Sequence, residues 1–125
     1  MILTVLQVAL GGALGASGRY LTGLAMSRLL GKGFPWGTLT VNIVGSFAMG
    51  ALVVILANTS GNRLAPFLMT GVLGGFTTFS AFSLDVATLY ERGDVAQAGL
   101  YVAASVAVSL AALFAGLSVT RSFFA

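Results

Sequence analysis

Four long apolar stretches, separated by short polar connections, divide the chain. Apolar residues dominate windows at residues 2–26, 36–57, 66–90 and 95–120. A helix needs about 20 apolar residues to cross a bilayer. Glycine, proline, asparagine and charged residues gather in the connections, including the stretch at 58–63, where turns are expected. The pattern predicts an all-α integral membrane protein with four transmembrane helices in a single domain.

The third window contains a segment that does not suit a simple lipid-facing helix. Residues 71–83 read GVLGGFTTFSAFS and combine three glycines, two threonines, two serines and three phenylalanines. Glycine lets the backbone leave the helix. Non-helical backbone at membrane depth persists only where protein or water surrounds it. We therefore expect the third helix to be broken between Gly74 and Thr77 and to line a polar path.

Composition supports a membrane protein and excludes several functions. The chain is 58% hydrophobic and 7% charged, with a mean hydropathy of +1.02, whereas soluble domains carry about 25% charged residues. Its six basic and three acidic residues are scattered and form no nucleic-acid patch. Without cysteine or histidine, disulfides and the usual transition-metal sites are excluded, and no enzyme chemistry is indicated. No basic residue precedes the first window, so a signal peptide is not expected.

The charges in the connections scarcely distinguish the two sides of the membrane. One side would carry Arg63 and Arg121, and the other Arg28, Lys32 and Arg92. An excess of Lys and Arg normally sets orientation, but here the sides differ by one charge. Two alternatives stay open: one weakly biased orientation, or dual topology, in which chains insert both ways and pair as antiparallel homodimers.

Neutral polar side chains recur at helical spacing in the second window. Thr38, Asn42 and Ser46 fall on one face. An asparagine in a membrane helix can bond a neighbouring helix. Its amide NH2 can equally donate to a passing anion.

The fourth window repeats this arrangement with hydroxyls. Tyr101, Ser105 and Ser109 are spaced by four residues and point the same way. A single serine can satisfy itself on a carbonyl of its own helix. Three hydroxyls in register instead predict a polar track.

Two charged residues fall inside the apolar windows. Arg19 could extend to the lipid headgroups, or form a cationic vestibule that raises the local anion concentration. Asp85 would cost about 2.5–3.5 kcal/mol at the bilayer centre. Asp85 or Ser83 could cap the helix that resumes after the break, or Asp85 could pair with Arg19.

Three motifs resemble the signatures of the Fluc fluoride channels, also called the CrcB family. They are GGxxGAxxRY from Gly11, GTLxxNxxG from Gly37 and GxxGGxTTFSxFS from Gly71. The third is the most specific, and together they extend over nearly the whole chain. The resemblance implies a fluoride-selective channel that exports cytoplasmic fluoride passively and so reduces its toxicity. It also implies an antiparallel dual-topology homodimer with two pores in the inner or plasma membrane.

The resemblance further implies roles for individual residues. A structural sodium ion would lie at the dimer axis, held by backbone carbonyls of Gly74 and Thr77 from both subunits. Phe79 and Phe82 would turn their positive ring edges toward fluoride, although phenylalanine alone reads equally as apolar filler. A pore must replace the water around an ion without trapping it. The neutral groups expected to do so are Asn42, Thr38, Ser80, Tyr101, Ser105 and Ser109.

Two other functions fit parts of the pattern. A small dual-topology multidrug efflux transporter has a similar size and four spans. Its proton coupling needs a membrane carboxylate, which in that family lies in the first span, whereas the charge here is Arg19. A non-transporting assembly subunit would explain small-residue pairs such as Gly11 and Gly15, but not the aligned hydroxyls.

Overall fold

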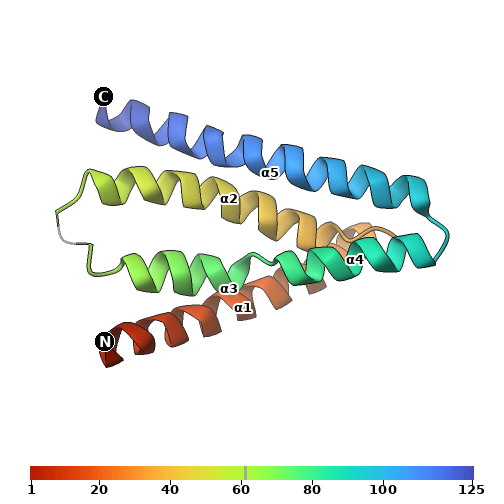
Figure 1. The fold of residues 1–125 in the computed structure, drawn as a ribbon, viewed down its shortest axis with the longest axis horizontal. Helices are drawn as coiled ribbons and strands as arrows, with labels where there is room; N and C mark the ends of the chain where they lie inside the picture. Colours follow the sequence, from red (N-terminus) through yellow and green to blue (C-terminus); the bar gives the residue numbers. More distant parts are fainter. Residues whose placement is uncertain (61) are drawn as a thin grey trace.

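Four long helical segments form the molecule (Figure 1). The computed structural model describes residues 1–60 and 62–125, so Gly61, within the predicted turn at 58–63, lies outside the described residues. All four segments are long and apolar enough to cross a membrane, which confirms the predicted all-helical class. The elements are α1 (Ile2–Leu30), α2 (Trp36–Ala57), η1 (Pro66–Leu73), α3 (Gly74–Phe76), α4 (Phe79–Glu91) and α5 (Val95–Phe124).

The helix ends follow the apolar windows closely. α2 begins and ends where its window does, and Pro66 begins the π-helix η1, where its missing N–H costs nothing. α1 and α5 each run four residues further than predicted. Both chain termini and the α2–η1 connection lie at one end of the molecule (Figure 1). The α1–α2 and α4–α5 connections lie at the opposite end.

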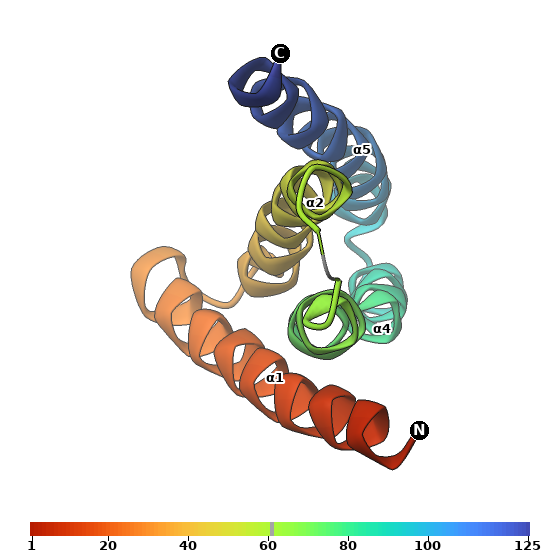
Figure 2. The same ribbon diagram turned by 90° about the vertical axis from the view of Figure 1, so that its left-hand side faces the viewer.

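The third segment changes its packing partner along its length. η1 and α3 pack against α1, whereas α4 packs against α5. α2 packs along α5 and also contacts α1. Viewed along the helices, α1 and α5 lie on opposite sides of α2 and the third segment (Figure 2). The break therefore connects η1 and α3, which pack against α1, to α4, which packs against α5.

Glycines allow α1 and the third segment to touch backbone to backbone. A Cβ added at Gly71 would lie 2.9 Å from the Cα of Gly11, and one at Gly75 would lie 2.7 Å from the carbonyl oxygen of Gly12. A Cβ at Gly15 would collide with the carbonyl of Val72. Small residues at such contacts let membrane helices gain van der Waals packing. We call Gly11, Gly15, Gly71 and Gly75 the glycine seam. It fixes the position of the third segment along the axis of α1.

The break lies later than the sequence predicts. Gly74 keeps helical angles of φ −62° and ψ −37°. Thr77 (φ −87°, ψ 160°) and Thr78 (φ −156°, ψ 126°) are extended. The prediction of a broken third helix holds at Thr77, but its start at Gly74 is wrong, because Gly74 and Gly75 are helical and Gly75 serves the close approach to α1.

Candidate functional site

Asn42 of α2 holds both backbone groups of Thr78 at the break. The Asn42 Nδ2 group donates to the Thr78 carbonyl at 3.0 Å, and the Thr78 N–H donates to Asn42 Oδ1 at 2.8 Å. One turn further along α2, Gly45 leaves the space that the Thr77 side chain occupies. The extended residues are thus seated on one face of α2, and two polar groups that would be costly in hydrocarbon are satisfied.

Thr78 also begins the helix that follows. Its Oγ1 accepts from the N–H of Ala81 at 3.0 Å, so Thr78 is the N-cap of α4. The two caps suggested by the sequence are therefore wrong. Ser83 instead donates to the carbonyl of Phe79, within its own helix. Ser80 is exposed, with its hydroxyl 3.2 Å from that of Thr78.

These bonds leave two carbonyls without their helical donors. In a continuous helix, the N–H of Thr78 would donate to the Gly74 carbonyl and that of Ala81 to the Thr77 carbonyl. Both N–H groups are committed elsewhere, to Asn42 and to Thr78 Oγ1. Among the described residues, no group of three His, Cys, Asp or Glu could hold a metal ion. The carbonyls of Gly74 and Thr77 are therefore free of their helical donors, and carbonyl oxygens of this kind suit a hard cation.

Arg19 and Asp85 have separate partners. The Arg19 Nε donates to the carbonyl of Gly75 at 3.1 Å, in a partly buried position beside the break. Asp85 accepts a hydrogen bond from the Tyr101 hydroxyl at 3.0 Å. The suggested Arg19–Asp85 pair is therefore wrong. The reason is that Arg19 lies against α3 while Asp85 lies on α4, beyond the break.

A cavity of about 440 Å³ lies beside the break, between α2, α4 and α5. Every side chain that lines it is neutral. Five of the predicted pore residues line it: Asn42, Phe79, Phe82, Ser105 and Ser109. Among the described residues, the hydroxyls of Ser105 and Ser109 are buried and have no hydrogen-bond partner. Buried polar groups are normally satisfied, so these two are free to bond something that enters the cavity.

Aromatic rings continue from this cavity in one row. Phe79 and Phe82 lie 5.5 Å apart between ring centroids, and Phe82 lies 5.2 Å from Tyr101. Tyr101 is fully buried, and its ring lies nearly perpendicular to that of Phe34, with 5.4 Å between the centroids. Phe34 lies 4.8 Å from Trp36. The row runs from the break to the connection between α1 and α2.

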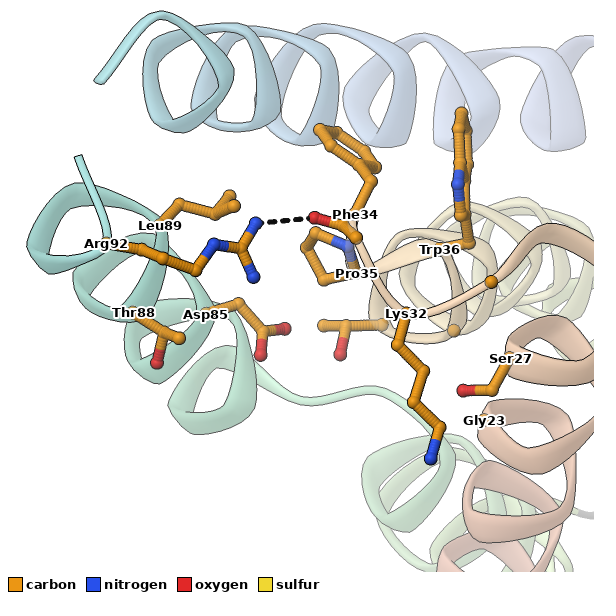
Figure 3. Close-up of a pocket in the computed structure, with 14 residues that line it drawn as sticks. Gly23, Ser27, Lys32, Phe34, Pro35, Trp36, Asp85, Thr88, Leu89 and Arg92 are labelled. Carbon is orange, nitrogen blue, oxygen red and sulfur yellow. Dashed lines mark hydrogen bonds between the residues drawn. The ribbon is translucent and has the colours of Figure 1, made fainter. Parts of the chain in front are cut away.

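A second cavity, of about 260 Å³, opens at that connection (Figure 3). It is lined by charged side chains, Lys32, Asp85 and Arg92, together with Thr38. Thr38 therefore lines the second cavity, one turn before Asn42 on α2, whereas Asn42 and the two serines line the first. The sequence instead predicts that all four line a single pore. Tyr101 joins the two cavities, since it contacts Phe82 on one side and Asp85 on the other.

Sequence reasoning missed two residues and one hydrogen bond of this site. Thr78 had a local signal, because a threonine directly before a helical segment is a common N-cap. The Asp85–Tyr101 bond joins residues 16 apart in different helices, and nothing local predicts it. Phe34 has no signal beyond its place in a glycine-rich connection.

The chain matches one known family and is similar to several proteins that share a name. The family described as CrcB-like protein, Camphor Resistance (CrcB), matches residues 6–117. A protein of Cereibacter sphaeroides named Fluoride-specific ion channel FluC is 64% identical over 125 residues, which is 100% of both chains. Proteins with the same name from Paracoccus denitrificans and Agrobacterium fabrum are 60% and 51% identical, over 98% of this chain in each case.

Proposed function

This chain belongs to the CrcB family, and on that premise we propose that it is a fluoride-selective channel that lets cytoplasmic fluoride leave passively. Its place would be the inner or plasma membrane, which fluoride must cross to leave the cell. The observation that carries the proposal is the neutral cavity beside the break, with its two buried and unpartnered serine hydroxyls.

The chemistry of this cavity suits a small, strongly hydrated anion. Fluoride can enter only if protein donors replace the water that it loses. Ser105 and Ser109 offer hydroxyl hydrogens, and the Asn42 amide has a second N–H beyond the one given to Thr78. The ring edges of Phe79 and Phe82 add weak positive potential. Because no lining side chain is charged, fluoride is bound without being trapped.

Flux from proteoliposomes tests the function. Vesicles loaded with fluoride should release it through the purified protein, and vesicles loaded with chloride should retain theirs. Phe82→Ile keeps apolar bulk but removes the ring, so fluoride release should fall. Phe114→Ile is the matched control, because Phe114 is 63% exposed on α5 and does not line the cavity. Equal release of chloride and fluoride would contradict the proposal.

We also propose that the channel is an antiparallel homodimer. Only 11–22% of each apolar window is buried within one chain, and Phe79 is 78% exposed although it lines the cavity. A single chain thus leaves one side of the path open. The nearly equal basic charges at its two ends favour insertion in both orientations.

A sodium ion at the break is a further part of the proposal. The carbonyls of Gly74 and Thr77 would hold it, since both have lost their helical donors. A bound sodium would supply static positive charge to satisfy those oxygens. The proposal predicts that exchanging sodium for a large organic cation lowers the thermal stability of the dimer. Unchanged stability at vanishing sodium would count against it.

A further inference from the structure

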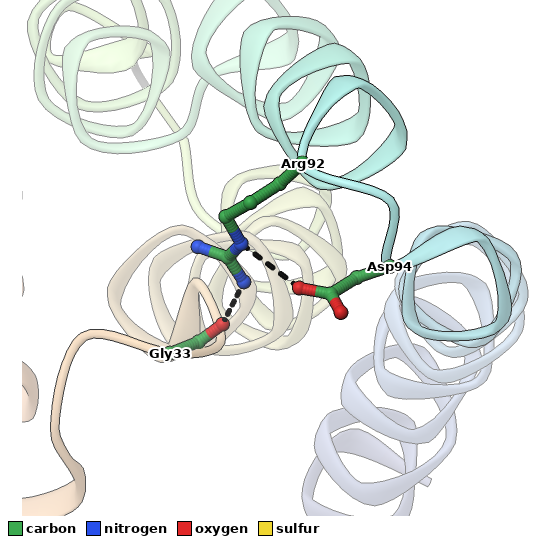
Figure 4. A network of polar contacts seen from close by, with 3 residues as sticks. All are labelled: Gly33, Arg92 and Asp94. Carbon is green, nitrogen blue, oxygen red and sulfur yellow. Dashed lines mark hydrogen bonds and ion pairs between the residues drawn. The ribbon is translucent and has the colours of Figure 1, made fainter.

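Arg92 joins two connections at one end of the molecule (Figure 4). Its guanidinium donates from one NH2 to the Gly33 carbonyl at 2.7 Å and from Nε to Asp94 Oδ2 at 2.8 Å. Gly33 belongs to the α1–α2 connection, whereas Arg92 and Asp94 belong to the α4–α5 turn. The rigid fork of arginine allows one side chain to hold both partners at once. We call these three residues the mouth latch.

The α4–α5 turn is the fixed side of the mouth latch. Gly93 has a φ of 91°, and its N–H donates to the carbonyl of Tyr90. The Asp94 N–H donates to the carbonyl of Leu89, a residue that is 2% exposed. These two bonds form a Schellman motif, which satisfies the last carbonyls of α4. The α1–α2 connection contains glycines at 31 and 33 and no helix, so it is the side that needs to be held.

Gly33 is followed directly by Phe34, which contacts the row of aromatic rings. The centroids of the Phe34 and Tyr101 rings lie 5.4 Å apart, and the two rings are nearly perpendicular. Tyr101 in turn donates to Asp85 and packs on Phe82. Holding Gly33 therefore determines where Phe34 packs against Tyr101, the residue that lies between the two cavities.

We propose that Arg92 is a positioning residue of the channel, which keeps Phe34 against Tyr101 and thereby fixes the row of aromatic rings beside the second cavity. The inference rests on the proposed fluoride conduction. It differs from a role in which Arg92 simply attracts anions with its charge. Attraction requires only a positive charge at the mouth, whereas the latch requires both hydrogen bonds.

Asp94→Ala separates the two roles. It removes the carboxylate partner and leaves Arg92, so the mouth becomes more positive. Attraction then predicts faster fluoride flux, whereas the latch predicts that flux falls about two- to fivefold, as expected for a partly exposed ion pair. Among the described residues, the Asp94 side chain makes no capping bond to α5, so the variant keeps that helix start. The Lys and Arg count that governs orientation is also unchanged.

Trp36 provides a readout that does not depend on fluoride. It is the single tryptophan of the chain and contacts Phe34. Loosening the connection in Asp94→Ala should make Trp36 fluorescence easier to quench with acrylamide. Arg92→Lys, which keeps the charge but loses the fork, should act in the same direction. Glu91→Ala is the matched control, because it removes an equal charge from an exposed position beside the mouth latch.

The outcomes distinguish the mouth latch from simple attraction of anions by Arg92. Lower flux with easier quenching in Asp94→Ala and Arg92→Lys, and neither change in Glu91→Ala, supports the mouth latch. Higher flux in both Asp94→Ala and Glu91→Ala, or a Trp36 signal unchanged in Asp94→Ala, overturns it. A wild-type protein that releases no fluoride overturns the proposed function instead.

Discussion

At the scale of single residues, the hydroxyls of Ser105 and Ser109 demand an explanation. A buried polar group without a partner costs about 1–3 kcal/mol, and within the described chain both hydroxyls are in this state. Neither bonds the carbonyl one turn earlier, as Thr22 and Thr88 do. The fold gains no hydrogen bond in return for burying these two hydroxyls. We infer that they are kept free to bond an ion.

Replacing both serines by alanine should therefore affect conduction more than stability. Ser105→Ala with Ser109→Ala removes two unbonded groups, so thermal stability should stay the same or rise slightly. Fluoride flux should fall about tenfold, the effect of losing roughly one hydrogen bond's free energy to the ion. Ser118→Ala, at an exposed position on the same helix, should change neither. Stability that falls together with flux would show that the hydroxyls serve the fold.

Asn42→Asp should harm both the break and the pore. The carboxylate can still accept from the Thr78 N–H but cannot donate to the Thr78 carbonyl, and it adds a negative charge beside an anion path. We expect a loss of about 1–3 kcal/mol in unfolding free energy and block of fluoride flux. Asn42→Ser keeps a donor and should retain part of the flux. Asn58→Asp loses a comparable amide-to-carbonyl bond at the far end of α2, and its flux should remain near wild type.

At the scale of helices, the glycine seam sets where the break lies. Gly11, Gly15, Gly71 and Gly75 bring α1 and the third segment into backbone contact. The extended residues Thr77 and Thr78 come immediately after this seam. The packing of η1 and α3 against α1 therefore determines where along the membrane normal α4 begins.

Gly15→Ala should disturb this arrangement, because its Cβ would overlap the Val72 carbonyl. α1 must then move away, and we expect about 1–3 kcal/mol of destabilisation from overpacking together with lower flux. Gly12→Ala is the control on the same helix: within the described chain, no atom lies within 4 Å of its added Cβ. Alanine there should be neutral or slightly stabilising. Equal effects of the two substitutions would exclude the seam as the cause.

The same helices show how far sequence reasoning reached. Apolar length predicted where the spans lie, and the four-residue spacing placed Tyr101, Ser105 and Ser109 on one face of α5, where the structure buries Tyr101 and Ser105. The position of the break was missed because a glycine in a helix can serve either unwinding of the backbone or close packing against another helix. The sequence does not distinguish these two uses. The Asn42–Thr78 bonds join residues 36 apart, so helical periodicity could not reveal them.

At the scale of the whole molecule, one chain is an open arrangement of helices. α1 and α5 stand apart, and the third segment bridges them through its break (Figure 2). Phe79 projects from this open side. In the proposed dimer, the same surface of a second chain in the opposite orientation would cover this open side.

Charge-biased variants test the antiparallel arrangement. Two lysines added to the α1–α2 connection make the Lys and Arg count five against two, and four added to the α2–η1 connection make it six against three, so each variant should force one orientation, opposite to that of the other. Each variant alone should lose nearly all fluoride flux, because identical orientations cannot pair antiparallel. Co-expression of the two should restore it. Full flux from one orientation alone would refute the dual-topology dimer, and single-site labelling of each connection would verify the orientations.

The bonds between Asn42 and Thr78 also bear on how the protein is made. A ribosome adding about 5–20 residues per second completes Asn42 roughly 2–7 s before Thr78, which follows it by 36 residues. We therefore expect the amide that satisfies the exposed backbone to reach the membrane before that backbone does. The hydroxyls of α5 come later still. Biosynthesis can thus insert the broken segment without waiting for the last span.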